Sequence, residues 1–162
     1  GGLDFVLVDY MQMLEGRGNR QEVIESAMRK AANAAKRYNI VWIFLTQVND
    51  KWQGRNDPRP ALGDMFGSNS MKQMCKTAFA LFRPSEHWPN PKGANHPLWG
   101  MYTRMLERFE SQGRGQAGRE IYGNLVELWL LKNVIGRKKA MKMFVAKPEV
   151  GILDEFDMGA WV

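Results

Sequence analysis

Two short apolar segments, each followed at once by polar residues, limit most strongly what this chain can fold into. Residues 3–8 carry a single acidic residue, Asp4, and end at Asp9, while residues 40–46 read IVWIFLT and end at Gln47. Apolar runs of this length, without alternating polar residues, are typical of strands that are covered on both faces of a parallel sheet. The sequence therefore predicts an α/β fold built around such a sheet.

A helical repeat fills the segment between these two runs. Asn19, followed three residues later by Glu22, predicts a capping box at the start of a helix. Apolar residues then recur at helical spacing as far as Tyr38, with lysines and arginines mostly on the other side. A strand, a helix and a strand in this order predict two parallel strands joined by a crossover helix.

The rest of the chain predicts further strands and helices, separated by long connections. We expect a short helix over 69–76, a strand over 78–82, a helix over 98–110, a strand over 125–131 and a closing hairpin over 141–146 and 150–153. Residues 49–70 and 84–97 are expected to be loops, and the glycine-rich residues 111–119 a flexible stretch. The expected whole is a single domain over 1–162, with a mainly parallel sheet, flanking helices and antiparallel C-terminal edge strands.

Composition narrows the partners and the compartment. The net charge of +6 favours an anionic partner, of which nucleic acid is the commonest. No apolar run approaches the roughly 18 residues of a membrane span, and the first residues lack the pattern of a secretory signal. One cysteine, Cys75, fits a reducing compartment. These features predict a cytoplasmic protein without a membrane partner.

Several phrases, in the right order, resemble motifs of DnaB-type replicative DNA helicases. Residues 8–14 (VDYMQML) resemble the Walker B strand of that family, which ends D-Y-L-Q-L, and residues 45–49 (LTQVN) resemble its L-S-Q-L-N segment. The later matches are Arg59-Pro60 with Leu62, Asp64 and Gln73, then residues 78–83 (AFALFR), then residues 131–133 with Gly136, which are similar to the family's K-x-R-N-G element. Residues 84–123 are longer than expected of the family and stay unassigned.

The resemblance implies the C-terminal part of a RecA-like ATPase core that uses ATP and Mg²⁺ in the intact protein. Asp9 would hold Mg²⁺, because a hard anionic ligand suits a hard cation. Gln47 would contact the γ-phosphate. The alternative for Asp9, which the strand end alone favours, is a residue that caps a turn; the alternative for Gln47 is a polar strand terminus.

The resemblance also implies a homo-oligomer, a hexameric ring in the intact protein, in which Lys132 reaches the ATP of a neighbouring subunit. The arginine finger of the family falls at Val134, and Arg137 is the candidate substitute. The alternative for this basic segment is an edge hairpin whose lysines discourage pairing with other strands.

Single-stranded DNA would bind two loops of the ring. The first covers residues 15–20 and the second covers residues 50–69. Their candidate contacts are the side chains of Arg17, Arg20, Lys51, Arg55 and Arg59 and the backbone amides of Gly67, Ser68 and Asn69. For any one of these arginines, a solvated surface role is an equally open alternative.

One family motif does not occur in the sequence. No G-x-x-x-x-G-K-S/T phosphate-binding loop is found, so the chain is expected to be a fragment that does not hydrolyse ATP alone. In the RecA-like fold the strand of that loop lies between the strands that end at Gln47 and Arg83. We expect these two strands to close up directly, or a second chain to lend a strand.

Two other functions stay open. The chain could derive from another RecA-family ATPase, such as a recombinase, or it could be a non-catalytic DNA-binding or interaction module. A phosphate-binding loop encoded upstream of Asp9 would favour the enzyme over the non-catalytic module.

Overall fold

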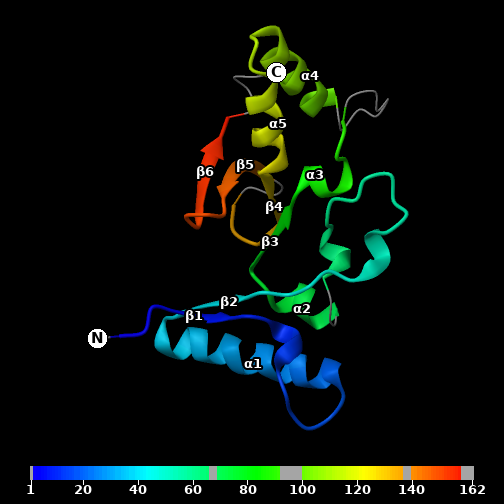
Figure 1. The fold of residues 1–162 in the computed structure, drawn as a ribbon. Coiled ribbons are helices and arrows are strands. Elements are labelled where there is room, and N and C mark those ends of the chain that lie inside the picture. Colours follow the sequence, from blue (N-terminus) through cyan, green and yellow to red (C-terminus); the bar gives the residue numbers. More distant parts are fainter. Residues whose placement is uncertain (1, 66–68, 92–99, 137–139, 158–162) are drawn as a thin grey trace.

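The computed structural model describes residues 2–65, 69–91, 100–136 and 140–157 (Figure 1). In chain order the elements are β1 (Phe5–Val8), the 3-10 turn η1 (Met11–Met13), α1 (Arg20–Tyr38), β2 (Val41–Phe44), the 3-10 turns η2 (Asp50–Trp52) and η3 (Leu62–Asp64), α2 (Asn69–Met74), β3 (Thr77–Phe82), α3 (Pro84–His87), α4 (Gly100–Ser111), α5 (Gly115–Gly123), β4 (Leu125–Asn133), β5 (Ala140–Lys147) and β6 (Ile152–Phe156).

The N-terminal part is the predicted strand, helix and strand. β1 and β2 pair in parallel, with Phe5 opposite Val41 at one end and Val8 opposite Phe44 at the other. The predicted capping box is confirmed: the Asn19 side chain accepts a hydrogen bond from the Glu22 backbone N–H at 3.0 Å, and Glu22 accepts one from the Asn19 backbone N–H at 3.1 Å. The cap fixes where α1 begins, and so fixes the length of the loop between β1 and the helix.

The C-terminal part is an antiparallel sheet with the strand order β3-β4-β5-β6. The predicted closing hairpin is confirmed as β5 and β6. Helices α3, α4 and α5 gather beside this sheet (Figure 1), and their apolar side chains share one core with it. The members of that core are Phe82, Trp88, Tyr102, Met105, Leu106, Phe109, Tyr122, Leu125 and Met143. The α/β class with antiparallel C-terminal strands is therefore confirmed.

The expected flexible stretch over 111–119 is wrong, because a helix begins inside it at Gly115. Gly118 lies against the ring of Phe109 so closely that an added Cβ would be 2.7 Å from the Cβ of Phe109. The glycine permits α5 to pack tightly on α4, which the local sequence does not reveal. The expected loop over 84–97 also holds one turn of helix, α3, with Pro84 at its first position, where proline is tolerated.

The two sheets are separate, so the expectation that the strands ending at Gln47 and Arg83 close up directly is wrong. Within the described ranges, β2 pairs with β1 alone and β3 pairs with β4 alone. The parallel part of the fold is thereby confined to β1 and β2. A strand lent by a second chain stays a prediction.

One face of the parallel pair carries uncovered apolar side chains. Val8, Trp42 and Phe44 face α1 across an apolar hollow. The opposite face exposes Phe5, Leu7, Val41, Ile43 and Leu45, each by 43% or more. Parallel sheets are normally covered on both faces, but this face is exposed. We call these five residues the bare face.

In the described part of the chain, no helix has the length and apolar character to cross a membrane.

Candidate functional site

Asp9 and Gln47 come to the same edge of the parallel pair. Asp9 directly follows β1, and Gln47 lies three residues beyond the end of β2. The Leu45 N–H donates to the Val8 carbonyl at 2.9 Å, so the two chain segments remain side by side past the last paired residues. Both polar side chains are exposed. The Asp9–Tyr10 peptide bond is cis.

This edge has the groups that a magnesium–nucleotide site needs. A carboxylate is a hard ligand for Mg²⁺, and an amide can donate to a phosphate oxygen. The two groups lie beyond the carboxyl ends of neighbouring parallel strands, where ligands bind in open α/β sheets. The roles of Asp9 with Mg²⁺ and of Gln47 with a phosphate stay predictions. Across the described ranges, no group of three or more His, Cys, Asp or Glu side chains could hold a metal by itself.

A third polar residue at this edge was missed from the sequence. Gln12 in η1 is only 6% exposed, and its Nε2 donates to the Thr46 hydroxyl at 3.1 Å. The Thr46 hydroxyl in turn donates to the Gln47 carbonyl oxygen at 3.3 Å. A glutamine inside an otherwise apolar phrase was the available signal.

The first candidate DNA loop is open to solvent. Arg17 lies in the connection between η1 and α1, and Arg20 is the first residue of α1. Both are exposed. Gly18 between them has a φ of +101°, which favours glycine. The structure therefore leaves both guanidinium groups on the surface, where they could meet a phosphate.

In the second candidate DNA loop, Arg55 helps to fold the loop itself. Its Nη2 lies 2.5 Å from Asp64 Oδ2 and 3.1 Å from the Arg59 carbonyl oxygen. Asp64, which is buried, also accepts the Ala61 N–H at 2.8 Å. Lys51 lies in η2, and Asn69 is the first residue of α2. Gly67 and Ser68 lie outside the described residues.

Arg59 is not on the loop surface, which corrects its assignment as a phosphate contact. Its side chain is 9% exposed, with Nε 2.7 Å from one oxygen of Glu127 and Nη2 2.9 Å from the other. The guanidinium carbon also lies 5.1 to 5.6 Å from the ring centres of Phe82, Trp88 and Trp129. A buried guanidinium is destabilising unless it is paired with a carboxylate. Here the pair with Glu127 keeps the Arg59 side chain in the interior.

Glu127 is the centre of this buried network. It is fully buried in β4 and also accepts hydrogen bonds from the Tyr102 hydroxyl and from Trp129 Nε1, the latter at 2.5 Å. Burial lowers the pKa of Arg59, but the hydrogen bonds and negative charges of Glu127 and Asp57 together outweigh burial and raise the pKa. The network ties the second loop to α4 and β4. A lone acid in the apolar run LVELWLL was its sequence signal.

Lys132, at the far end of β4, caps a helix of its own chain. Its Nζ donates to the Lys72 carbonyl oxygen at 2.6 Å and to the Gln73 carbonyl oxygen at 3.2 Å, both in the last turn of α2. A cation is favourable at a helix C-terminus. Its expected reach to a neighbour's ATP stays a prediction. Arg137 lies outside the described residues, and Val134 is exposed in the turn after β4.

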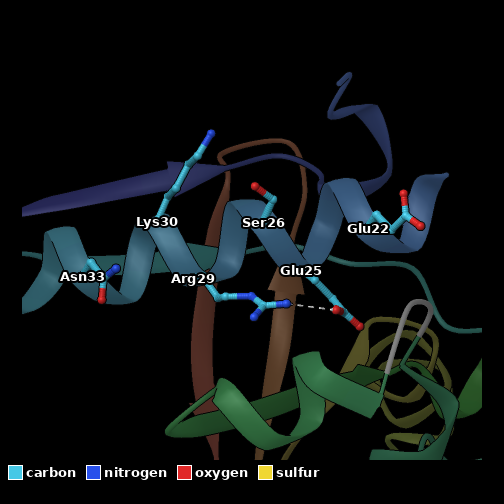
Figure 2. Close-up of a pocket in the computed structure, with 6 residues that line it drawn as sticks. All are labelled: Glu22, Glu25, Ser26, Arg29, Lys30 and Asn33. Atoms are coloured by element: carbon cyan, nitrogen blue, oxygen red, sulfur yellow. Dashed lines mark hydrogen bonds and ion pairs between the residues drawn. The ribbon is translucent and has the colours of Figure 1, made fainter. Parts of the chain in front are cut away.

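A hollow along α1 is not a candidate site. It is lined by Glu22, Glu25, Ser26, Arg29, Lys30 and Asn33, which all project from one helix (Figure 2). Arg29 pairs with Glu25 at 3.4 Å across it. Mixed charges on one side of a single exposed helix are typical of a solvated surface.

Residues 1–111 match the family model of the DnaB-like helicase C terminal domain. The chain belongs to this family. The match includes Asp9, Gln47 and both candidate DNA loops, and it continues through α4, so it covers much of the segment 84–123 that the motifs left unassigned. The resemblance of the sequence to DnaB-type helicases is thereby confirmed.

Curated relatives are similar over part of their length. The replicative DNA helicase DnaC of Bacillus subtilis is 30% identical over 86 residues, which are 51% of this chain and 19% of that protein. The replicative DNA helicase DnaB of Pasteurella multocida is 29% identical over 133 residues, which are 78% of this chain and 28% of that protein. The chain thus spans less than a third of either relative.

Solved structures share the fold over almost the whole chain. One of them, described as an ATPase domain, superposes with a TM-score of 0.70 at 20% identity, covering 97% of this chain and 46% of that one. A DnaB-like replicative helicase, described with its interactions with primase, gives the same TM-score at 19% identity and covers 97% of this chain and 32% of that one. These likenesses show a shared fold, and this chain corresponds to less than half of either solved chain.

Proposed function

We propose that this chain is part of the motor of an ATP-dependent replicative DNA helicase, which translocates on single-stranded DNA and unwinds duplex. The observation that carries the proposal is the position of Asp9 and Gln47 at one edge of two neighbouring parallel strands, inside the region that matches the DnaB-like family. In the intact protein, ATP with Mg²⁺ would bind at this edge, and the family match favours a helicase over a recombinase-like ATPase.

The chain's own residues would bind and orient the nucleotide. The exposed Asp9 carboxylate fits Mg²⁺ held mostly through water. The Gln47 amide would donate to the terminal phosphate and lies directly before the second loop. Bound Mg²⁺ would offset the negative charge of the phosphates during hydrolysis. Lys132 and Arg137 would act on the ATP of the next subunit in a hexameric ring, in the cytoplasm of a bacterial or phage-infected cell.

The DNA contacts are proposed mainly for the first loop, where Arg17 and Arg20 are exposed. Lys51 and the backbone amides of Gly67, Ser68 and Asn69 would add contacts from the second loop. Each cation that neutralises a phosphate releases a counterion, so affinity falls as salt rises.

Anisotropy of a labelled oligo(dT) of about 20 nucleotides tests this contact, since such a strand fills one binding groove. Replacing both Arg17 and Arg20 by glutamine is expected to weaken binding and to flatten the plot of log affinity against log salt by about 1.4, or 0.7 for each lost contact. The matched control replaces Arg104 and Arg119, two exposed arginines on α4 and α5, by glutamine and so removes the same charge. An equal effect of both pairs would show that net charge, and not this loop, binds the DNA.

A polypeptide of these 162 residues is proposed not to hydrolyse ATP alone, because its sequence holds no G-x-x-x-x-G-K-S/T loop to grip the phosphates. Steady phosphate release that single-stranded DNA stimulates, and that Asp9→Asn abolishes, would contradict this.

A non-catalytic DNA-binding module is the second candidate, and one observation favours it. Val134 occupies the position of the family's arginine finger, and valine cannot supply a guanidinium. DNA-stimulated hydrolysis by the intact protein would exclude this candidate.

A further inference from the structure

We propose that Gln12 is a positioning residue that couples the first DNA loop to the strand end carrying Gln47. The proposal rests on the proposed function, because it assigns the two ends of the coupling to DNA and to the nucleotide phosphate. What it adds is a connection between them through the side chains of Gln12 and Thr46.

Gln12 stands between the two sites along the chain and in space. It lies in η1, after Asp9 and before the loop with Arg17. Its Nε2 donates to the hydroxyl of Thr46, 34 residues further along the chain, at 3.1 Å. That hydroxyl donates to the carbonyl oxygen of Gln47 at 3.3 Å. Two hydrogen bonds therefore connect η1, which directly precedes the first DNA loop, with the backbone of the predicted phosphate-contacting residue.

The main-chain bonds between the two segments stop one residue before this connection. The Leu45 N–H donates to the Val8 carbonyl, and the Leu45 carbonyl accepts the Met11 N–H, each at 2.9 Å. Among the described residues, the next bond across the same gap is the one from Gln12 to Thr46. A displacement of η1 would therefore reach Leu45 through the Met11 backbone N–H, and it would reach Thr46 and Gln47 through the Gln12 side chain.

The energetics of Gln12 do not suit a purely structural residue. Its side chain is buried, and its Oε1 has no hydrogen-bond partner within the part of the chain that the structure describes. A buried acceptor without a partner lowers stability, and methionine of similar size would fill the same space without that cost. The glutamine gives something that methionine cannot, which is the bond to Thr46.

The consequence for the motor is a path from DNA to nucleotide. When a phosphate backbone draws the first loop toward it, η1 moves with the loop. The Gln12 amide then pulls on the Thr46 hydroxyl and so shifts the backbone of Gln47. Binding of DNA in the first loop and contact with a phosphate at Gln47 become dependent on each other.

Hydrogen exchange of the backbone amides of residues 45–48, with and without oligo(dT), tests the coupling in the 162-residue chain. In the wild type, oligo(dT) is expected to slow exchange at these amides. Gln12→Met and Thr46→Val are expected to raise their exchange without DNA by about fivefold, as suits the loss of one hydrogen bond. Both variants should also lose the effect of oligo(dT) while still binding it.

Two variants serve as matched controls. Thr46→Ser keeps the hydroxyl and is expected to retain the DNA-dependent slowing. Gln21→Met makes the same chemical change at an exposed position of α1, where Gln21 donates a hydrogen bond to Glu25 of its own helix at 3.4 Å, and should behave as the wild type. The unfolding temperature of Gln12→Met should equal or exceed that of the wild type, which separates a lost coupling from a lost fold.

The outcomes are distinguishable. If the wild type binds oligo(dT) and the slowing at residues 45–48 survives in Gln12→Met, the coupling is wrong and the proposed function stands. If the wild type binds without any slowing at these residues, the coupling is equally wrong. If the wild type does not bind oligo(dT), the proposed DNA contact fails and takes the coupling with it.

Discussion

Replacing Glu127 by glutamine tests the buried network most directly. The change keeps the size of the side chain but removes the buried one of the two carboxylates that pair with Arg59; the other, Asp57, is 43% exposed and stays at 3.4 Å. Glu127 is fully buried, and the Arg59 side chain is 9% exposed, so water cannot replace the lost partner. Removing one partner of a buried ion pair costs about 3–5 kcal/mol, and the remaining pair with Asp57 favours the lower end of this range. For a domain of this size that corresponds to a fall in unfolding temperature of about 10 °C.

Urea unfolding followed by tryptophan fluorescence is a suitable assay, because Trp88 and Trp129 lie against Arg59. The double variant Arg59→Met with Glu127→Leu is expected to lose less stability than Glu127→Gln alone, since it leaves no unpaired charge in the interior. The control is Glu155→Gln. Glu155 pairs with Lys142 at 2.6 Å, but both side chains are 61% exposed, and surface pairs contribute at most about 1 kcal/mol.

The reasoning would be refuted if Glu127→Gln cost no more than Glu155→Gln. The single variants Arg59→Met and Glu127→Leu complete the test. The reasoning would also be refuted if the stability loss of the double variant equalled the sum of the losses of these two single variants, because the two groups would then act independently.

Two further predictions concern the packing of helices. Gly118→Ala should lower the stability of the protein by about 1–3 kcal/mol through overpacking against Phe109. Gly123→Ala should not lower it, because the added Cβ would meet no neighbouring atom within 4 Å among the described residues. Equal unfolding temperatures for the two variants would contradict the close contact of α4 and α5. Lys132→Met should free the end of α2, because Lys132 donates to the Lys72 carbonyl oxygen there. Cys75 Sγ lies 3.7 Å from that oxygen, so a thiol reagent should modify Cys75 faster in the variant. An unchanged rate would show that the lysine does not hold this helix.

Local features of the sequence predicted the structure well where the interacting groups are close together in the chain. The capping box joins Asn19 to Glu22, so its two halves lie in one turn of sequence. The apolar runs before Asp9 and Gln47 predicted both parallel strands and the edge at which they end. The motif resemblance predicted the family.

Features that depend on distant partners were not predictable. Arg59 lies in a polar loop, which indicates exposure, and only Glu127, 68 residues later, draws it inside. In α5, Gly118 packs closely against Phe109, a tertiary contact that the glycine-rich sequence does not indicate. The separation of the two sheets depends on which strands find partners, and no single segment carries that information.

The bare face has a practical consequence for handling the protein. The bare face is an exposed apolar surface beside an edge of β2 that has no partner strand within the described residues. Exposed apolar surfaces and open strand edges favour association between molecules. A purified sample is expected to cluster as it is concentrated or warmed, since apolar attraction strengthens with temperature near ambient conditions. A dye whose fluorescence rises on binding to exposed apolar surfaces should therefore bind the folded protein in the absence of denaturant.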